Sequence, residues 1–265
     1  MRYEPTLARP VRGKLRHMQS HMDIQPHWHV WAQLVFSISG AVRVSAQSDG
    51  PDVSYLVPPS RAVWIPPGVV HAVTAVEQAA LRTLYLHEDA VKTLSTDGDD
   101  WSHCRVLEVT PLLRELVLQL TVEPDAVPAT GADLTREQGI CTLILDELRR
   151  ARSLRLGLPL PRAGRLRRIC EAMLDQPLRH ADIGGWATEA ATSPRTLARW
   201  FSEELGTSYG QWRQQMLLAK ALALAARKQP MRLIAAELGY ASPSAFSAMV
   251  TRAVGMPPSR FFAEA

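Results

Sequence analysis

The sequence has little cysteine and no long apolar run, and each absence excludes a class of protein. Its three cysteines, Cys104, Cys141 and Cys170, are widely separated and form no Cys-x-x-Cys pair. We therefore expect reduced, buried thiols rather than a disulfide framework or a thiolate zinc site. No stretch approaches the roughly 20 apolar residues of a membrane span, and the N-terminus lacks the apolar run of a signal peptide. We predict a cytoplasmic protein without a membrane partner.

Neither sign of charge dominates, but the positive charge is unevenly distributed. The 265 residues carry a formal net charge of +4. Residues 165–265 contain 13 Lys and Arg against 8 Asp and Glu, whereas residues 1–164 contain 17 against 18. Contact with nucleic-acid phosphates requires a basic excess of this kind. The C-terminal part is therefore where a DNA contact would lie.

Short apolar runs separated by turn residues predict β-structure across residues 1–90. Gly40 and the stretches 49–51 and 66–68, rich in Gly and Pro, are among the breaks. Several short strands with such turns are typical of a small sandwich or barrel. The predicted strands cover residues 32–38, 41–46, 53–57, 62–65 and 81–86.

Four polar side chains in this β-region form a candidate ligand site: His27, His29, Gln33 and His71. His27 and His29 are two residues apart on an extended segment and therefore share a face, while Trp28 points the other way. Imidazole nitrogens that converge in this way can hold a metal ion.

The spacing of these residues resembles the two motifs of the cupin barrel. The motifs are His27-x-His29-x3-Gln33-x6-Gly40 and Pro66-x-Gly68-x2-His71. Metal-binding cupins have His, His, Glu and His at the four positions, and a neutral amide at Gln33 is a poorer metal ligand than a carboxylate. Two interpretations stay open: the three histidines hold a divalent metal, or they line a small-molecule pocket without one. The matched spacing argues against a third, that they are incidental surface residues.

Residues 87–105 are polar and acidic, and we interpret them as a solvated connection rather than a calcium loop. Beyond them, apolar side chains at helical spacing predict helices over residues 111–123 and 134–155. Their apolar stripes can cap the barrel or join a second subunit. The predicted assembly is a homodimer.

A Ser-Pro pair followed by a Gly 13 residues after the Ser occurs twice in the C-terminal part. Ser193-Pro194 begins a segment that ends at Gly206, and Ser242-Pro243 begins one that ends at Gly255. Ser and Pro are typical of a helix start, and Gly is typical of a helix end. A shorter predicted helix precedes each copy, so the helix-turn-helix arrangement occurs twice. These shorter helices cover residues 182–190 and 231–238, and a helix over residues 209–227 joins the two copies.

The two copies carry motifs that identify a family. The second contains Ile234-Ala235-x2-Leu238-Gly239-Tyr240-x-Ser242-x-Ser244-x-Phe246 and Gly255-x-Pro257-Pro258-Ser259-Arg260-Phe261. The first matches through Ala187, Ser193, Thr196, Leu197, Arg199, Phe201, Gly206 and Trp212. Residues 165–262 thereby resemble the DNA-binding domain of AraC/XylS-type transcriptional regulators. Two positions depart from the family pattern, with Leu217 where Arg is usual and Val250 where an aromatic residue is usual.

The resemblance implies that the second helix of each pair enters the DNA major groove. Arg199 and Thr196 occupy or flank base-reading positions, and Arg195 contacts either a base or a phosphate. The second copy offers small side chains, so we expect the first copy to read sequence and the second to position the protein. Leu197, Trp200 and Phe201 are expected in the core. The candidate DNA-binding residues are Ser193, Arg195, Thr196, Arg199, Ser242, Ser244, Ala245, Ala248 and Met249.

The two resemblances cover nearly the whole chain and imply an α+β protein with two domains. A cupin-like β-barrel with a helical connector precedes an all-α domain with two helix-turn-helix units. An Arg-, Pro- and Gly-rich stretch at residues 149–162 is the best boundary. We predict a ligand-sensing domain over residues 1–105, a connector with a dimerisation role over residues 106–160, and a DNA-binding domain over residues 161–265.

The predicted function is sequence-specific regulation of transcription by a protein that is not an enzyme. The candidate partners are double-stranded DNA, RNA polymerase, and a small-molecule effector or a divalent metal in the cupin pocket. One alternative is a cupin metalloenzyme fused to a DNA-binding domain, against which Gln33 argues. Another is a direct metal sensor built on His27, His29 and His71. The sequence leaves open the effector, the operator and the choice between activator and repressor.

Overall fold

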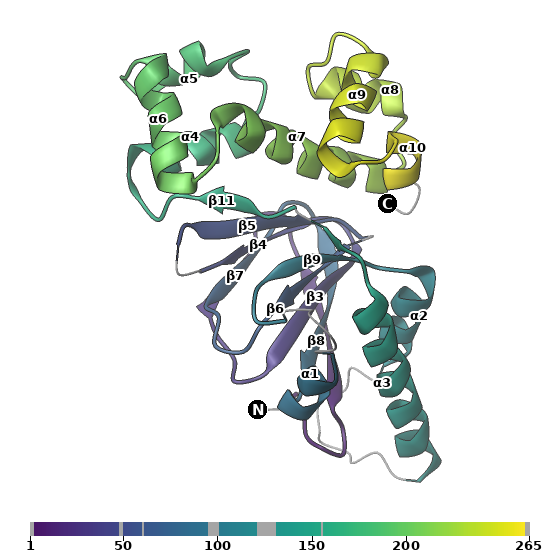
Figure 1. The fold of residues 1–265 in the computed structure, drawn as a ribbon. Helices are drawn as coiled ribbons and strands as arrows, with labels where there is room; N and C mark the ends of the chain where they lie inside the picture. Colours follow the sequence, from purple (N-terminus) through teal and green to yellow (C-terminus); the bar gives the residue numbers. More distant parts are fainter. Residues whose placement is uncertain are drawn as a thin grey trace. The chain divides into compact units, whose positions relative to one another are not determined.

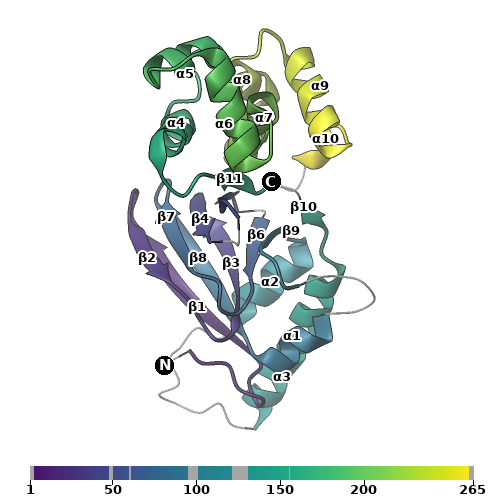
Figure 2. The same ribbon diagram turned by 60° about the vertical axis from the view of Figure 1, so that its left-hand side comes forward.

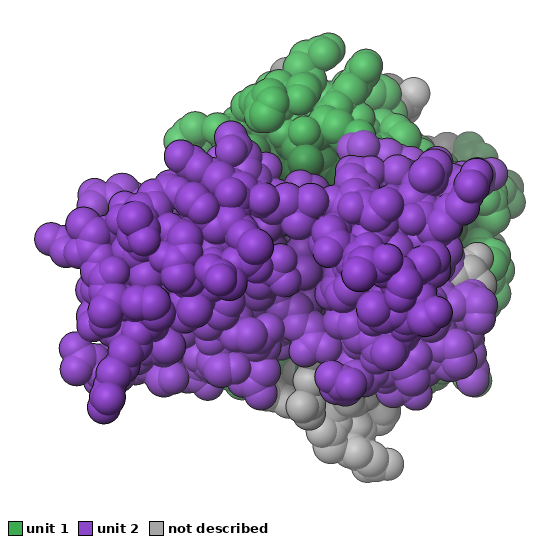
Figure 3. All heavy atoms as spheres, turned by 90° about the horizontal axis from the view of Figure 1, so that it is seen from above, with its two compact units in different colours: residues 1–46, 57–155 green, residues 47–56, 156–265 purple. Residues whose placement is uncertain are grey.

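The computed structural model describes residues 3–47, 50–59, 61–94, 101–120, 131–154 and 156–262. The chain forms two compact units (Figure 3). The first unit combines residues 1–46 with 57–155, and the second combines residues 47–56 with 156–265. No helix within the described residues is long and apolar enough to cross a membrane. The three-part division into residues 1–105, 106–160 and 161–265 stays a prediction.

A six-stranded antiparallel sheet is the main layer of the first unit (Figure 1). Its strands lie in the order β1-β8-β3-β6-β9-β10, so neighbouring strands come from distant parts of the sequence. At its centre, Leu34 lies opposite Leu84 on one side and Trp64 on the other. The strands are β1 (Val11–Met18), β3 (Ala32–Ser39), β6 (Arg61–Ile65), β8 (Ala79–Leu86), β9 (Arg105–Glu108) and β10 (Ser153–Leu154).

Two helices, α2 (Pro111–Gln119) and α3 (Ala132–Arg150), cover one face of this sheet (Figure 2). Because side chains alternate along a strand, Gln33, Thr83 and Tyr85 point to the opposite face. The core between sheet and helices includes Leu34, Phe36, Trp64, Leu84, Leu86, Leu113, Val117, Ile144 and Leu148.

A second layer of the first unit contains β2 (Asp23–His27), β7 (His71–Ala75) and β4 (Val42–Ala46), with β7 between the other two. The two layers face each other, since a ring nitrogen of His71 on β7 lies 3.1 Å from the amide oxygen of Gln33 on β3. The predicted α+β fold class with a cupin-like N-terminal domain is confirmed. Its strands form two facing sheets rather than a closed barrel.

The second unit contains the two helix-turn-helix units that the doubled pattern predicts. Ser193 and Ser242 are N-caps whose hydroxyls accept an amide hydrogen bond from three residues ahead, at 3.1 and 3.2 Å. Gly206 and Gly255 end the same helices with φ of 63° and 72°, a left-handed conformation that favours glycine. The helix pairs are α5 (Ile183–Glu189) with α6 (Pro194–Leu205), and α8 (Met231–Glu237) with α9 (Pro243–Val254).

Helix α7 (Tyr209–Ala226) joins the two pairs as one uninterrupted helix. Ser208 caps it by accepting the Gln211 amide hydrogen bond at 3.2 Å, and Trp212 and Leu222 are fully buried. The unit is completed by α4 (Gly164–Asp175) before the first pair and α10 (Pro258–Phe261) after the second.

Two strands also belong to the second unit, β11 (Leu158–Leu160) and β5 (Asp52–Val57) apart from its last residue. They pair antiparallel, with Leu158 opposite Ser54. The indole nitrogen of Trp212 donates a hydrogen bond of 2.7 Å to the carbonyl oxygen of Pro159. A strand that the sequence places in the N-terminal β-region therefore belongs to the second unit.

Several elements differ from the sequence-based expectation. Strand β1 was not predicted because Arg12, which is 2% exposed, interrupts its apolar pattern. Helix α1 (Glu88–Leu94) lies where a solvated connection was expected, and its Ala90 and Leu94 are buried. Residues 95–100 of that connection and residues 121–123 of the predicted helix lie outside the described residues.

Candidate ligand pocket and DNA-binding surface

The fold brings the three candidate histidines together between the sheets of the first unit. His27 ends β2, His29 follows it, and His71 begins β7 directly opposite His27. One ring nitrogen from each histidine can be chosen so that the three lie within 4.8 Å of one another. The ring centroid of His27 lies 4.4 Å from that of His71 and 4.9 Å from that of His29. The predicted convergence of His27, His29 and His71 is thus present in the structure.

Hydrogen bonds to the backbone orient two of the rings. Nδ1 of His27 lies 2.8 Å from the carbonyl oxygen of Gln25, and Nδ1 of His71 lies 2.9 Å from that of Val69. A carbonyl only accepts hydrogen bonds, so each Nδ1 carries the proton in the neutral ring and Nε2 keeps its lone pair. Metal-binding histidines are commonly oriented by such an outer hydrogen bond.

Burial keeps the third histidine neutral. Both ring nitrogens of His29 are buried, and the nearby Gln33 side chain favours protonation of the ring. Desolvation, with smaller contributions from His27 and His71, lowers the pKa of His29 to about 4. Burial also lowers the pKa of His71. Since a metal binds only unprotonated imidazole, the lowered pKa values fit a divalent ion at the cluster.

Gln33 lies inside the cluster, as the sequence predicts, and is 4% exposed. Its amide contacts Nε2 of His71 at 3.1 Å. If Nε2 of His71 holds a lone pair, the amide NH2 group must face it, because only that group can donate. Gln33 then donates a hydrogen bond to the one lone pair of His71 Nε2, and this bond must open before Nε2 can bind a metal.

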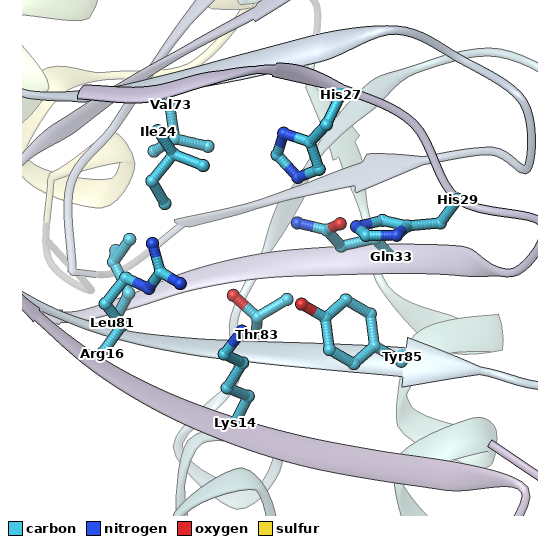
Figure 4. A pocket seen from close by; sticks show the side chains of 10 residues that line it. All are labelled: Lys14, Arg16, Ile24, His27, His29, Gln33, Val73, Leu81, Thr83 and Tyr85. Atoms are coloured by element: carbon cyan, nitrogen blue, oxygen red, sulfur yellow. The ribbon is translucent and has the colours of Figure 1, made fainter. Parts of the chain in front are cut away.

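Three residues of the cluster, His27, His29 and Gln33, line one wall of a cavity of about 200 Å³ (Figure 4). Lys14 and Arg16 of β1, together with Thr83 and Tyr85 of β8, line it on the side of the six-stranded sheet. Sequence reasoning missed these four residues. The spacing Lys14-x-Arg16 places both cations on one face of a strand, but the same spacing is common on solvated strands. The cavity is lined by Lys14, Arg16, Ile24, His27, His29, Gln33, Val73, Leu81, Thr83 and Tyr85.

On the first recognition helix, α6, the structure exposes the two candidate arginines, Arg195 and Arg199. Arg199 Nε lies 3.7 Å from a carboxylate oxygen of Glu203, and both side chains are more than 60% exposed. The hydroxyls of Ser193 and Thr196 already hydrogen-bond within the helix: they lie 2.9 Å apart, and Ser193 also caps α6. The two arginines are therefore the basic side chains that α6 exposes.

Trp200 of α6 is less buried than the sequence predicts. Leu197 and Phe201 are fully buried, as predicted, but Trp200 is only half-buried. Trp200 directly follows the exposed Arg199 along the helix, so its large ring lies at the edge of the core and is partly covered.

On the second recognition helix, α9, the exposed candidates are small: Ser244, Ala245 and Ala248. Met249 is half-buried, and Ser242 serves as the N-cap. The exposed candidates on α9 are thus smaller and uncharged compared with those on α6, and the division into a reading and a positioning helix stays a prediction.

The two departures from the family pattern lie in the core of the second unit. Leu217 is 1% exposed and Val250 is fully buried. Leu217 therefore stabilises packing, and its side chain cannot contact a phosphate in this structure.

Comparison with known proteins assigns both parts of the chain. Residues 12–151 match the family described as AraC-like ligand binding domain, and residues 186–264 match the family described as helix-turn-helix domain. The HTH-type transcriptional regulator NimR of Escherichia coli K12 is 32% identical over 240 residues, which cover 89% of this chain and 81% of NimR. The arabinose operon regulatory protein of the same strain is 28% identical over 116 residues, 43% of this chain and 40% of that protein.

A solved structure, ToxT from Vibrio cholerae, aligns over 96% of this chain and 98% of its own. Its sequence identity is 12% and its TM-score is 0.38, so it supports no structural argument. The two family matches and the similarity to NimR show the family of the chain. The chain belongs to the AraC family of transcriptional regulators, with an AraC-like ligand-binding domain and a helix-turn-helix DNA-binding domain.

Proposed function

We propose that occupation of the cavity in the first unit changes how tightly the two helix-turn-helix units bind their operator. The supporting observation is the convergence of polar side chains on one cavity in the ligand-binding domain, the usual form of a small-molecule site. The ligand must bind the two DNA-binding states of the protein with different affinity, since otherwise it could not shift their populations. Operator binding with and without ligand is therefore the defining measurement.

We further propose that His27, His29 and His71 hold a divalent metal ion within this cavity. Two outward hydrogen bonds and one imidazole whose ring nitrogens are both buried support the assignment. A bound metal would supply a fixed positive charge with open coordination positions for an effector.

Metal analysis of the purified protein and a Zn²⁺ titration after chelation test the metal site. One ion per chain should bind, and His29→Ala should weaken binding by at least about tenfold, since it removes one of three ligands. His17→Ala on the exposed side of β1 is the matched control. Absence of metal from the purified protein, together with no effect of Zn²⁺ on operator affinity, would remove this proposal and leave the metal-free pocket.

We also propose a homodimer formed through the helices α2 and α3. Leu112 and Leu143 on these helices are 52% and 50% exposed, so an interface there would remove apolar surface from water. Sedimentation equilibrium should detect a dimer, and the double variant Leu112→Glu, Leu143→Glu should shift it toward monomer. An unchanged mass distribution would contradict this interface. RNA polymerase as a partner and action in the cytoplasm stay predictions from the resemblance.

A further inference from the structure

The cavity contains two cations that the proposed function has not used. Lys14 and Arg16 are alternate residues of β1, and both side chains point into the space between the sheets (Figure 4). Each is half-buried. Within the described residues neither side chain has an acidic partner or a side-chain hydrogen bond, and none of the ten lining residues is Asp or Glu. Lys14 does contact the ring of Tyr3, with its Nζ 5.2 Å from the ring centroid, but no carboxylate neutralises either cation in the lining of the cavity.

The two cations in this arrangement disfavour each other's charge. Desolvation and the neighbouring Arg16 lower the pKa of Lys14, which shows that the surroundings disfavour its charge. Two like charges in a partly buried space cost free energy unless an opposite charge joins them. An anion that enters the cavity would offset this cost and gain charge-assisted hydrogen bonds.

The remaining lining restricts the shape of that anion. Thr83 places its hydroxyl beside Lys14, while Ile24, Val73 and Leu81 give one end of the cavity an apolar surface (Figure 4). Its volume of about 200 Å³ is below the roughly 300–1,000 Å³ of typical drug-sized sites. The cavity therefore suits a short apolar body that bears one charged group.

We propose that the effector is a small organic anion whose charged group lies between Lys14 and Arg16 and whose apolar part contacts Ile24, Val73 and Leu81. This inference rests on the proposed function, in which the cavity is the effector site. A carboxylate is the simplest such group, because its two oxygens match the planar fork of an Arg side chain.

The test compares acids with their neutral amides, using the full-length protein. The probes are butanoate, hexanoate, benzoate and salicylate, each paired with its own amide at equal millimolar concentration. Thermal unfolding should shift upward with at least one acid and remain unshifted with its amide, because the amide lacks the charge. Amides that stabilise the protein as well as the acids would overturn the inference. A panel in which no acid shifts the transition would also overturn it, since an uncompensated pair of cations should bind small carboxylates at least weakly.

Variants identify the binding groups. Lys14→Gln and Arg16→Gln should each raise the Kd of the responding acid by about tenfold, the loss expected for one charge-assisted hydrogen bond. Lys92→Gln, an exposed cation on α1 outside the cavity, is the matched control and should leave the Kd unchanged. If the double variant keeps the response while His27→Ala abolishes it, the anion binds the histidine cluster instead and the inference is wrong.

Operator affinity, measured in parallel, separates this inference from the proposed function. If acids bind through Lys14 and Arg16 but operator affinity does not change, the anion site stands and the regulatory role fails. If a neutral probe changes operator affinity and no acid binds, the regulatory role stands and the anion inference fails.

Discussion

At the scale of single residues, Gln33 is the side chain that separates this pocket from a four-ligand metal site. Gln33→Glu adds a carboxylate next to His71 without changing the size of the side chain. We expect Zn²⁺ affinity of the chelated protein to rise by about tenfold or more, because carboxylates bind divalent ions better than amides. Gln25→Glu, on the exposed side of β2, is the matched control and should change Zn²⁺ binding little. Equal or weaker Zn²⁺ binding by Gln33→Glu would contradict a metal site at the cluster.

The buried histidines should make the metal-free protein sensitive to acid. His29 has a pKa of about 4 in the folded chain, whereas an exposed His has 6.5, so between these values the unfolded chain binds more protons. The free energy of unfolding should therefore decrease as the pH falls below 6.5, and above pH 6.5 this contribution should be complete. Thermal unfolding in the presence of chelator, from pH 7 to about 5, measures this slope.

In that series His29→Gln should flatten the pH dependence, while the exposed control His17→Gln should preserve it. An identical slope in wild type and His29→Gln would show that other groups cause the acid sensitivity.

Arg199 is the side chain we expect to read a base. Arg199→Ala should weaken operator binding by about 1–3 kcal/mol and relax the preference at one base pair. Ala248→Ser on α9 is the comparison, and it should leave the preference unchanged. Gel-shift titrations on operator and random DNA distinguish the roles, since equal losses on both would mean that Arg199 contacts only phosphate.

At the scale of elements, the close packing between β5 and the segment before β11 explains one glycine. A Cβ atom at Gly157 would lie 2.8 Å from a ring carbon of Tyr55 and 2.9 Å from a methyl group of Val53. Gly157→Ala should therefore destabilise the second unit by about 1–3 kcal/mol through overpacking. Chemical denaturation measures the change.

Gly139→Ala is an informative control for that substitution. Gly139 is exposed within α3, and a Cβ atom there would meet nothing within 4 Å. Alanine should stabilise the helix by about 0.5–1 kcal/mol, because glycine loses more conformational freedom on folding. A stabilising Gly157→Ala would show that Tyr55 and Val53 move aside without cost.

The helix-turn-helix units could be predicted because their signals are local. Ser193 and Gly206 mark both ends of α6 within one short segment, and the observed cap hydrogen bond and left-handed glycine follow directly. The histidine cluster could be predicted from motif spacing. The position of Lys14 and Arg16 in the cavity could not be predicted. It depends on the pairing of β1 with β8, which lies about 70 residues away, and no pattern in the neighbouring sequence indicates that pairing.

At the scale of the whole molecule, the chain enters the second unit through residues 47–56 as well as through residues 156–265. A fragment that begins at residue 156 lacks β5, and β11 then loses its antiparallel partner. We expect the amides of β11 to exchange with solvent faster in this fragment than in the full chain, because unpaired strand amides are exposed. Hydrogen exchange of residues 158–160 measures this, and equal protection would show that β5 is dispensable.

The pairing of β5 with β11 also bears on how such regulators can diversify. If recombination joined the first 155 residues of one relative to the remainder of another, β5 and β11 would come from different parents. The residues at positions 53, 55 and 157 would then pack well only if both parents happened to have side chains of matching size there. New combinations of sensor and DNA-binding parts should therefore arise most readily among relatives that share these few contact residues, or when the segment 47–56 is inherited along with the C-terminal part.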